Sequence, residues 1–274
     1  MMPEHLSASQ LSMFQRCGEQ WRRRYIDGEI IPPGIAARVG TGVHKAAELN
    51  FREKMESGED LPLDVIQDAA AEAYAAALQN GVFFAPDEVD GAHIAMAEGK
   101  DTAVSLATVF RNELAPTINP AFVEQRVTLE LGLSLPVVTV IDLYTQRREL
   151  RDLKTSGRRW TDDKARTSPQ PTLYREAIRA LTDEYPERIV FDVLVQGRKP
   201  ELQKIETVRD ADDLRVLIRQ FEIMLMSVQA GIFPPAQPDS WNCSPRWCGY
   251  FYSCPYIAAH RKIIPVGTHT QPLA

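Results

Sequence analysis

Helical patterns of apolar residues occupy the first part of the chain, and no strand-type run interrupts residues 62–115. Ser7 and Ser9 can cap a first helix that runs towards Cys17. A second helix is predicted from about residue 40 to residue 58. Its apolar face consists of His44, Ala47, Phe51 and Met55. Residues 62–115 are rich in alanine and predict a helical insertion.

Strand patterns dominate the later part of the chain. Val123 to Leu131 alternates between apolar and polar residues, and Val137 to Ile141 is a β-forming run that we expect to end at Asp142. The expected strands, in chain order, are 123–131, 137–142, 149–155, 188–195 and 204–208, with helices at 169–181 and 210–230. This order predicts an α/β fold with a mixed central sheet flanked by helices.

Composition narrows the class of protein. The chain has 274 residues, of which 44% are hydrophobic and 25% charged, as in ordinary globular proteins. It has no apolar run of about 18 residues and no signal-peptide pattern, so we expect a cytoplasmic protein without a membrane span. A net charge of −6 argues against a general nucleic-acid coat protein. Basic residues nevertheless gather between Arg147 and Arg166 and at Arg22-Arg23-Arg24, which fits an enzyme that meets a polyanion at one site.

The cysteines are unevenly placed. Cys17 stands alone, whereas Cys243, Cys248 and Cys254 fall within twelve residues. In a cytoplasmic chain, clustered cysteines indicate a metal site before a disulfide framework. Three of the four tryptophans also flank cysteines, so we expect the two ends of the chain to meet.

One strand carries an acidic and a basic residue on the same face. Side chains alternate along a strand, so Asp152 and Lys154 point the same way, and Asp142 ends the neighbouring strand. Two carboxylates at adjacent strand ends form an oxygen-rich site for a hard divalent cation, and the lysine can stabilise charge on a phosphodiester. Asp162-Asp163-Lys164 has the same spacing but follows no strand pattern, so we interpret it as a solvated loop.

Four motifs surround this pair in a fixed order: Gly40-Thr41-Gly42-Val43-His44, Val140-Ile141-Asp142, Arg151-Asp152-Leu153-Lys154-Thr155 and Gln170-Pro171-Thr172-Leu173-Tyr174. Together they resemble the RecB-like branch of the PD-(D/E)xK nuclease superfamily, over about residues 6 to 256. The opening LSASQLSMFQRC resembles the start of its iron–sulfur members, which include AddB-type and CRISPR-adaptation nucleases. The chain departs from the second motif, because Thr139 and Val140 stand where a glycine is usual.

The resemblance implies a restriction-endonuclease-like core and a set of site residues. His44, Asp142 and Asp152 would bind Mg²⁺ or Mn²⁺, with the Leu153 carbonyl as a further ligand. Lys154 would be the catalytic lysine. Gln170 and Tyr174 would line the site and hold the DNA or the lysine, and Glu124 is a candidate for an additional carboxylate.

The resemblance also favours a 4Fe–4S cluster. Its ligands would be Cys17, Cys243, Cys248 and Cys254, so residues 241–256 would form an iron–sulfur region together with Cys17. The spacing between Cys243 and Cys248 departs from the usual family pattern, and a structural zinc site is the alternative.

The expected function is a metal-dependent DNA nuclease, an exonuclease on single strands or DNA ends, in recombination, repair or phage-type DNA processing. Nothing in the chain resembles a Walker A loop, so a helicase, recombinase or single-strand-binding partner would be a separate chain. Two other classes remain open. One is a DNA-binding iron–sulfur or zinc protein with a vestigial nuclease site, and the other is an iron–sulfur redox or sensor protein, which would need no Asp-x-Lys strand.

Overall fold

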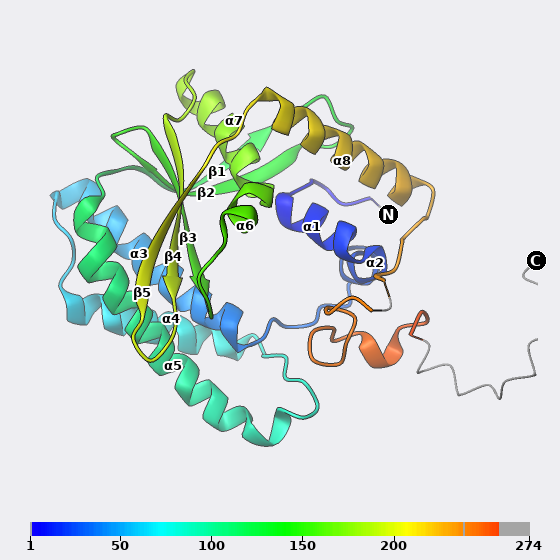
Figure 1. Cartoon of the computed structure of the whole chain (residues 1–274), viewed down its shortest axis with the longest axis horizontal. Coiled ribbons are helices and arrows are strands. Elements are labelled where there is room, and N and C mark those ends of the chain that lie inside the picture. The colour runs from blue at the N-terminus through cyan, green and yellow to red at the C-terminus, as the bar shows by residue number, and fades with distance from the viewer. Residues whose placement is uncertain (1, 238, 258–274) are drawn as a thin grey trace, which may run out of the picture.

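A five-stranded sheet forms the centre of the molecule in a computed structural model, which describes residues 2–237 and 239–257 (Figure 1). Its strands are β1 (Pro120–Leu129), β2 (Val137–Thr145), β3 (Glu149–Ser156), β4 (Arg188–Val195) and β5 (Glu201–Thr207), and they lie side by side in chain order. The β3–β4 pair is parallel and the other pairs are antiparallel. The predicted α/β fold with a mixed sheet is therefore confirmed.

Helices cover both faces of the sheet (Figure 1). On one face lie α3 (Ile35–Ser57), α4 (Leu63–Gln79) and α5 (Ala92–Val109), and on the other lie α1 (Ala8–Arg16), α7 (Gln170–Thr182) and α8 (Ala211–Gln229). Two shorter helices are α2 (Gly18–Tyr25) and α6 (Asp162–Thr167). Each face has its own buried core. The core on the side of α3, α4 and α5 includes Phe51 and Phe110. The core on the side of α1, α7 and α8 includes Leu173 and Phe221.

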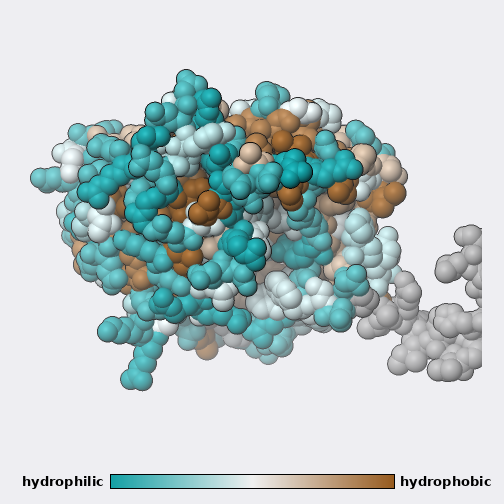
Figure 2. Space-filling model, turned by 45° about the horizontal axis from the view of Figure 1, so that its top comes forward, coloured by the Kyte–Doolittle hydropathy of each residue, from teal (hydrophilic) through white to brown (hydrophobic). Residues whose placement is uncertain are grey.

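Helix α8 also presents apolar side chains to solvent. Val216, Ile223 and Met226 are each about half exposed along its outer side, at 53%, 48% and 53%. Figure 2 shows an apolar area in the upper right of the molecule, on the side where α8 lies. No helix of the described residues has the length and hydropathy needed to cross a membrane.

Several boundaries differ from the sequence-based expectations. Helix α3 begins at Ile35, directly after its N-cap Gly34, because Ala36 and Ala37 extend the helix towards the Pro32-Pro33 break. Met55 is 48% exposed, so its assignment to the apolar face of this helix is wrong. The Asp162 segment is a short helix rather than a loop, since the Thr161 side chain accepts the Lys164 N–H and caps it.

The two ends of the described chain meet, as expected. The Gly18 N–H donates to the Pro234 carbonyl at 2.7 Å, and Trp21 stacks on Phe233 with 6.2 Å between ring centroids. The Tyr250 hydroxyl donates to the Glu29 carbonyl. These contacts place the C-terminal cysteines beside α1 and α2.

Candidate functional site

The site forms where two central strands separate. The β2–β3 ladder pairs Tyr144 with Leu150 and Leu143 with Arg151, and it stops there. Beyond the last pair lie Asp142, which precedes Leu143 on β2, and Asp152, which follows Arg151 on β3. The freed Leu153 N–H donates to Asp142 Oδ2 at 3.2 Å. The sequence-based prediction that Asp142 ends its strand is wrong, because β2 continues to Thr145, but this residue does lie where the pairing to β3 opens.

Helix α3 brings His44 to this opening. His44 Nδ1 lies 3.7 Å from Asp142 Oδ2. The glycines of the first motif explain the close approach of the helix. A Cβ on Gly40 would lie 3.1 Å from Thr155 Oγ1 of β3, and a Cβ on Gly42 would lie 2.7 Å from the Ala70 carbonyl of α4. Larger residues would push α3 away from β3 or from α4.

Strand β1 adds a third potential ligand, Glu124. His44, Glu124 and Asp142 each offer one ligand atom, and these atoms lie within 4.8 Å of one another. The backbone of Glu124 has φ of 48°, a left-handed conformation that is uncommon for a residue with a Cβ. Such strain often accompanies functional positions. The sequence suggested Glu124 only as an additional carboxylate, and the structure places it in the group with His44 and Asp142.

Asp152 lies beside the lysine rather than within this trio. Lys154 Nζ is 2.6 Å from Asp152 Oδ2, and the Asp152 residue is only 2% exposed. Neither Asp152 oxygen has a hydrogen bond of normal geometry to the described residues. A buried carboxylate with unused acceptor capacity is suited to a cation. Since carboxylate oxygens and imidazole nitrogen also suit Mg²⁺ or Mn²⁺, the donor set fits a divalent ion.

Helix α7 supplies a relay of hydrogen bonds behind the lysine. Lys154 Nζ donates to Gln170 Oε1 at 3.1 Å, and Gln170 Nε2 donates to the Tyr174 hydroxyl at 2.9 Å. The Tyr174 hydroxyl donates to Asp142 Oδ1 at 3.4 Å. Gln170 and Tyr174 are one turn apart, so both reach the same side of the site. Seven of the eight residues singled out from the four motifs and β1 therefore bring their side chains to the β2–β3 opening. They are His44, Glu124, Asp142, Asp152, Lys154, Gln170 and Tyr174. The eighth, Leu153, contributes its backbone N–H, which donates to Asp142.

Burial perturbs the acids and bases of the site. Burial lowers the pKa of His44 to about 4, with help from the nearby Lys154 charge, so its imidazole is neutral and able to ligate a metal near pH 7. Burial and the neighbouring Asp142 raise the pKa of Glu124 to about 7. Burial also raises the pKa of Asp152 to about 6, although Lys154 opposes the shift. The metal-free site therefore destabilises the ionised forms of Glu124 and Asp152, and a bound cation would stabilise them.

Lys154 and Tyr174 keep their protons. Burial alone would lower the pKa of Lys154, but the carboxylates of Asp152 and Asp142 outweigh it and raise that pKa. Burial and the same two carboxylates raise the pKa of Tyr174 well above 10. The hydrogen-bond relay therefore has the protonated ammonium of Lys154 at one end and the protonated hydroxyl of Tyr174 at the other.

The basic run at 147–166 is mostly paired within the chain. Arg151 is 5% exposed and donates to both oxygens of Asp192, at 2.6 and 2.8 Å, so its interpretation as part of an open polyanion surface is wrong. Arg151 stands in a predicted strand between Leu150 and Leu153, and this position in the sequence could have indicated that its side chain is buried. Further ion pairs from the two basic segments are Arg148–Glu187, Arg159–Glu201, Arg166–Asp163, Arg22–Glu19 and Arg23–Glu29.

The four cysteines line one cavity of about 240 Å³. They form no disulfide. Burial raises the pKa of Cys248, and the other three cysteines add to this, so the cavity disfavours thiolates unless a cation is present. Phe251 and Tyr256 also border the cavity. Trp247 borders a different cavity and is 58% exposed.

Carboxylates, an imidazole and a lysine at the opening of a mixed sheet can together bind a divalent cation and stabilise charge on a phosphodiester. The family model of the PD-(D/E)XK nuclease superfamily matches residues 5–256, and the chain belongs to this superfamily. Nucleases of this superfamily use divalent metals. No curated protein matches the chain.

Solved structures share the fold. A crystal structure from Eubacterium rectale named "Putative exonuclease" is 15% identical, with a TM-score of 0.55 over 99% of this chain and 91% of the other. At this identity the likeness shows the fold alone. The crystal structure of SSO0001 is 16% identical over 90% of this chain and 95% of the other, and its TM-score of 0.34 carries no weight.

Proposed function

We propose that this protein is a metal-dependent deoxyribonuclease that hydrolyses phosphodiester bonds, acting as an exonuclease on single-stranded DNA or DNA ends. The observation that carries the proposal is the meeting of Asp142 and Asp152 at the β2–β3 opening, with Lys154 Nζ 2.6 Å from Asp152. Membership in the nuclease superfamily supports the reaction class. Exonuclease action is also the activity that the name of the Eubacterium rectale protein gives for that protein.

In this proposal, His44, Glu124 and Asp142 hold a divalent cation, Mg²⁺ or Mn²⁺, and Asp152 with the Leu153 carbonyl completes the site. When bound, the cation polarises the phosphodiester and lowers the pKa of a water molecule. Neutral imidazole at His44 is the form that ligates. Burial raises the pKa of Glu124 to about 7 and that of Asp152 to about 6, and a bound cation would favour the ionised form of both groups.

Lys154 acts on the phosphate and the attacking water. Its ammonium stabilises the negative charge that grows on the phosphoryl oxygens, in a buried site where such charges interact strongly. Gln170 fixes the Nζ atom by accepting its hydrogen bond, and Tyr174 fixes Gln170. The relay ties the lysine to Asp142, so the ammonium and the carboxylates keep one relative position.

The cysteine cavity is proposed to hold a 4Fe–4S cluster bound by Cys17, Cys243, Cys248 and Cys254. A single tetrahedral zinc ion would require sulfurs about 3.8 Å apart, given Zn–S bonds of about 2.3 Å. A cavity of about 240 Å³ bordered by four thiols suits a cluster, which is larger than a single ion. Its role is to join the two chain ends.

The test is direct. Protein purified without oxygen is incubated with end-labelled single-stranded and double-stranded DNA in Mg²⁺, Mn²⁺ or EDTA. The proposal expects metal-dependent release of mononucleotides or short products from linear single strands, with closed circular single strands left intact. Cleavage of circles would replace the exonuclease assignment with an endonuclease, and no cleavage in either metal would overturn the nuclease proposal.

A further inference from the structure

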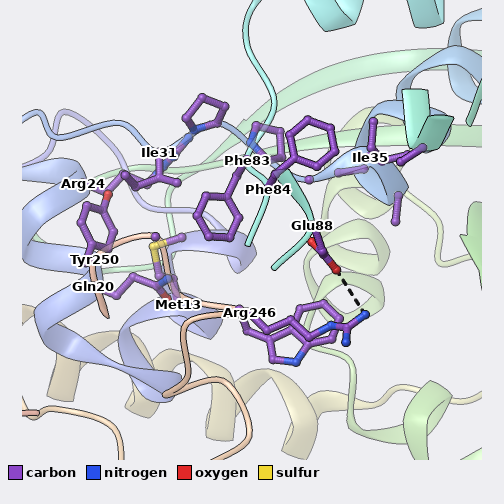
Figure 3. A pocket seen from close by; sticks show the side chains of 18 of the residues that line it. Met13, Gln20, Arg24, Ile31, Ile35, Phe83, Phe84, Glu88, Arg246 and Tyr250 are labelled. Carbon is purple, nitrogen blue, oxygen red and sulfur yellow. Dashed lines mark ion pairs between the residues drawn. The ribbon is translucent and has the colours of Figure 1, made fainter. Parts of the chain in front are cut away.

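A cavity of about 890 Å³ lies away from the ligand cluster, at the N-terminal end of α3 (Figure 3). Its walls come from α2, the segment before α3, residues 83–95 and the loop at 246–250. Of its lining residues, Arg24 belongs to the basic cluster at Arg22-Arg23-Arg24, and Arg246, Trp247, Gly249 and Tyr250 belong to the segment 241–256. The cavity is large enough for a drug-sized ligand or a similar portion of a polymer.

Five aromatic residues are among those that line this cavity. Phe83 and Phe84 both line it, and Figure 3 shows them beside Ile31 and Ile35. Trp247 also lines the cavity and is 58% exposed. Aromatic faces that solvent can reach are platforms on which unpaired nucleobases stack, whatever the base.

The charge of the cavity favours a polyanion. Arg24 lines it and forms no ion pair within the described part of the chain, unlike Arg22 and Arg23. Arg246 pairs with Glu88 at 3.2 Å, and its side chain remains 61% exposed. Helix α3 also begins here with no side-chain cap, so the positive end of its dipole faces the cavity beside exposed Ala36 and Ala37.

The aromatic wall is held rigidly against α3. The Arg38 guanidinium donates to the Gly81 carbonyl at 2.6 Å and to the Asn80 carbonyl at 3.2 Å. The Phe83 N–H donates to the Pro33 carbonyl at 3.2 Å. A wall fixed in this way loses little conformational freedom when a ligand binds.

The same helix connects the cavity to the metal-ligand cluster. Ala37, Thr41 and His44 lie at helical spacing along α3, and the first two are small and exposed. Nine residues separate Ile35 from His44, which is about 13.5 Å at 1.5 Å per residue. That distance is about four nucleotides of a stacked strand at 3.4 Å each, and fewer if the strand is extended.

We propose that this cavity, defined by Arg24, Phe83, Phe84 and Trp247, seats unpaired bases of a single DNA strand whose backbone reaches the metal site along α3. The inference rests on the proposed nuclease function and adds the place where the single strand binds. Bases within a duplex cannot offer both faces to such a wall. Single-stranded DNA is therefore preferred over blunt duplex.

The test measures binding separately from cleavage. Affinity for a fluorescent dT20 strand and for a blunt duplex is measured by anisotropy in EDTA, with full-length wild type, Phe83→Leu/Phe84→Leu and Arg24→Gln. Leucine keeps the apolar packing and removes the ring. Tyr185→Leu is the control, because Tyr185 is a 41% exposed aromatic that stacks with Arg175 outside the cavity.

Loss of the two rings should weaken binding of the single strand about 10-fold or more, and leave duplex binding and the control unchanged. Abasic substitutions scanned along the strand should weaken wild-type binding at one or two adjacent positions and have no such effect in the double variant. Equal affinity of wild type and double variant for dT20 would overturn the inference, as would equal losses for strand and duplex. Ring-dependent binding without cleavage in any metal would contradict the nuclease proposal and leave this inference standing.

Discussion

Replacing Lys154 with methionine removes the ammonium and keeps most of the side-chain stem. The Nζ atom lies 2.6 Å from Asp152 Oδ2 and 3.1 Å from Gln170 Oε1, and the side chain is 23% exposed. A phosphate bound at this site would lie within about 4 Å of the ammonium, where one charge is worth about 4 kcal/mol at an effective dielectric constant of 20. That energy corresponds to a rate loss of about 10³-fold. Removal of a single preorganised donor typically costs about 10²- to 10³-fold.

The assay is single-turnover cleavage of an end-labelled strand at saturating Mg²⁺. Lys164→Met is the matched control, because Lys164 belongs to the second Asp-x-Lys sequence and rests on the Trp160 ring, 4.1 Å from its centroid. We expect Lys154→Met to lose about 10³-fold in rate while Mn²⁺ binding, followed by calorimetry, stays equal or tightens, since a cation is removed from the site. A rate within tenfold of wild type would refute this role of the lysine.

Two further predictions concern stability. Cys248→Ala should remove the proposed cluster and reduce bound iron from about four atoms per chain to none. It should lower the free energy of unfolding by up to about 5 kcal/mol, because the cluster would no longer close a loop between the chain ends in the unfolded state. An iron-free variant that melts at the wild-type temperature would contradict this. The pKa of Glu124 rises from 4.5 to about 7 on folding because of burial and Asp142, so its contribution to the stability of metal-free protein is fully present below pH 4.5 and is lost as the pH rises to about 7. Urea unfolding in EDTA at pH 5, 6 and 7 should show this decline in wild type and a smaller decline in Glu124→Gln, and identical slopes would count against the assignment.

Local patterns in the sequence predicted much of this molecule. Strand alternation placed Asp152 and Lys154 on one face, and their 2.6 Å contact confirms it. Helical spacing likewise placed Gln170 and Tyr174 together, where they share a hydrogen bond. These contacts depend on residues two or four apart, whose relation is fixed by the period of the element.

Features that depend on distant pairing could not be predicted in this way. The opening of β2 from β3 beside Asp142 is a property of the ladder, and nothing in Val140-Ile141-Asp142 shows where pairing stops. The burial of Arg151 requires Asp192, which is 41 residues away on β4. The left-handed backbone of Glu124 has no local signal, since glycine or asparagine would be expected at a positive φ.

The central claim is that the carboxylates at the β2–β3 opening bind the metal that cleaves DNA. The most direct measurement compares wild type and Asp142→Asn across a Mn²⁺ titration, following cleavage of an end-labelled single strand by protein purified without oxygen. The account predicts that wild type is inactive without metal and saturates with it. It predicts that Asp142→Asn binds Mn²⁺ more weakly and stays at least about 10²-fold slower at every concentration. Wild-type cleavage that persists in EDTA, or equal rates for the two proteins, would contradict the account.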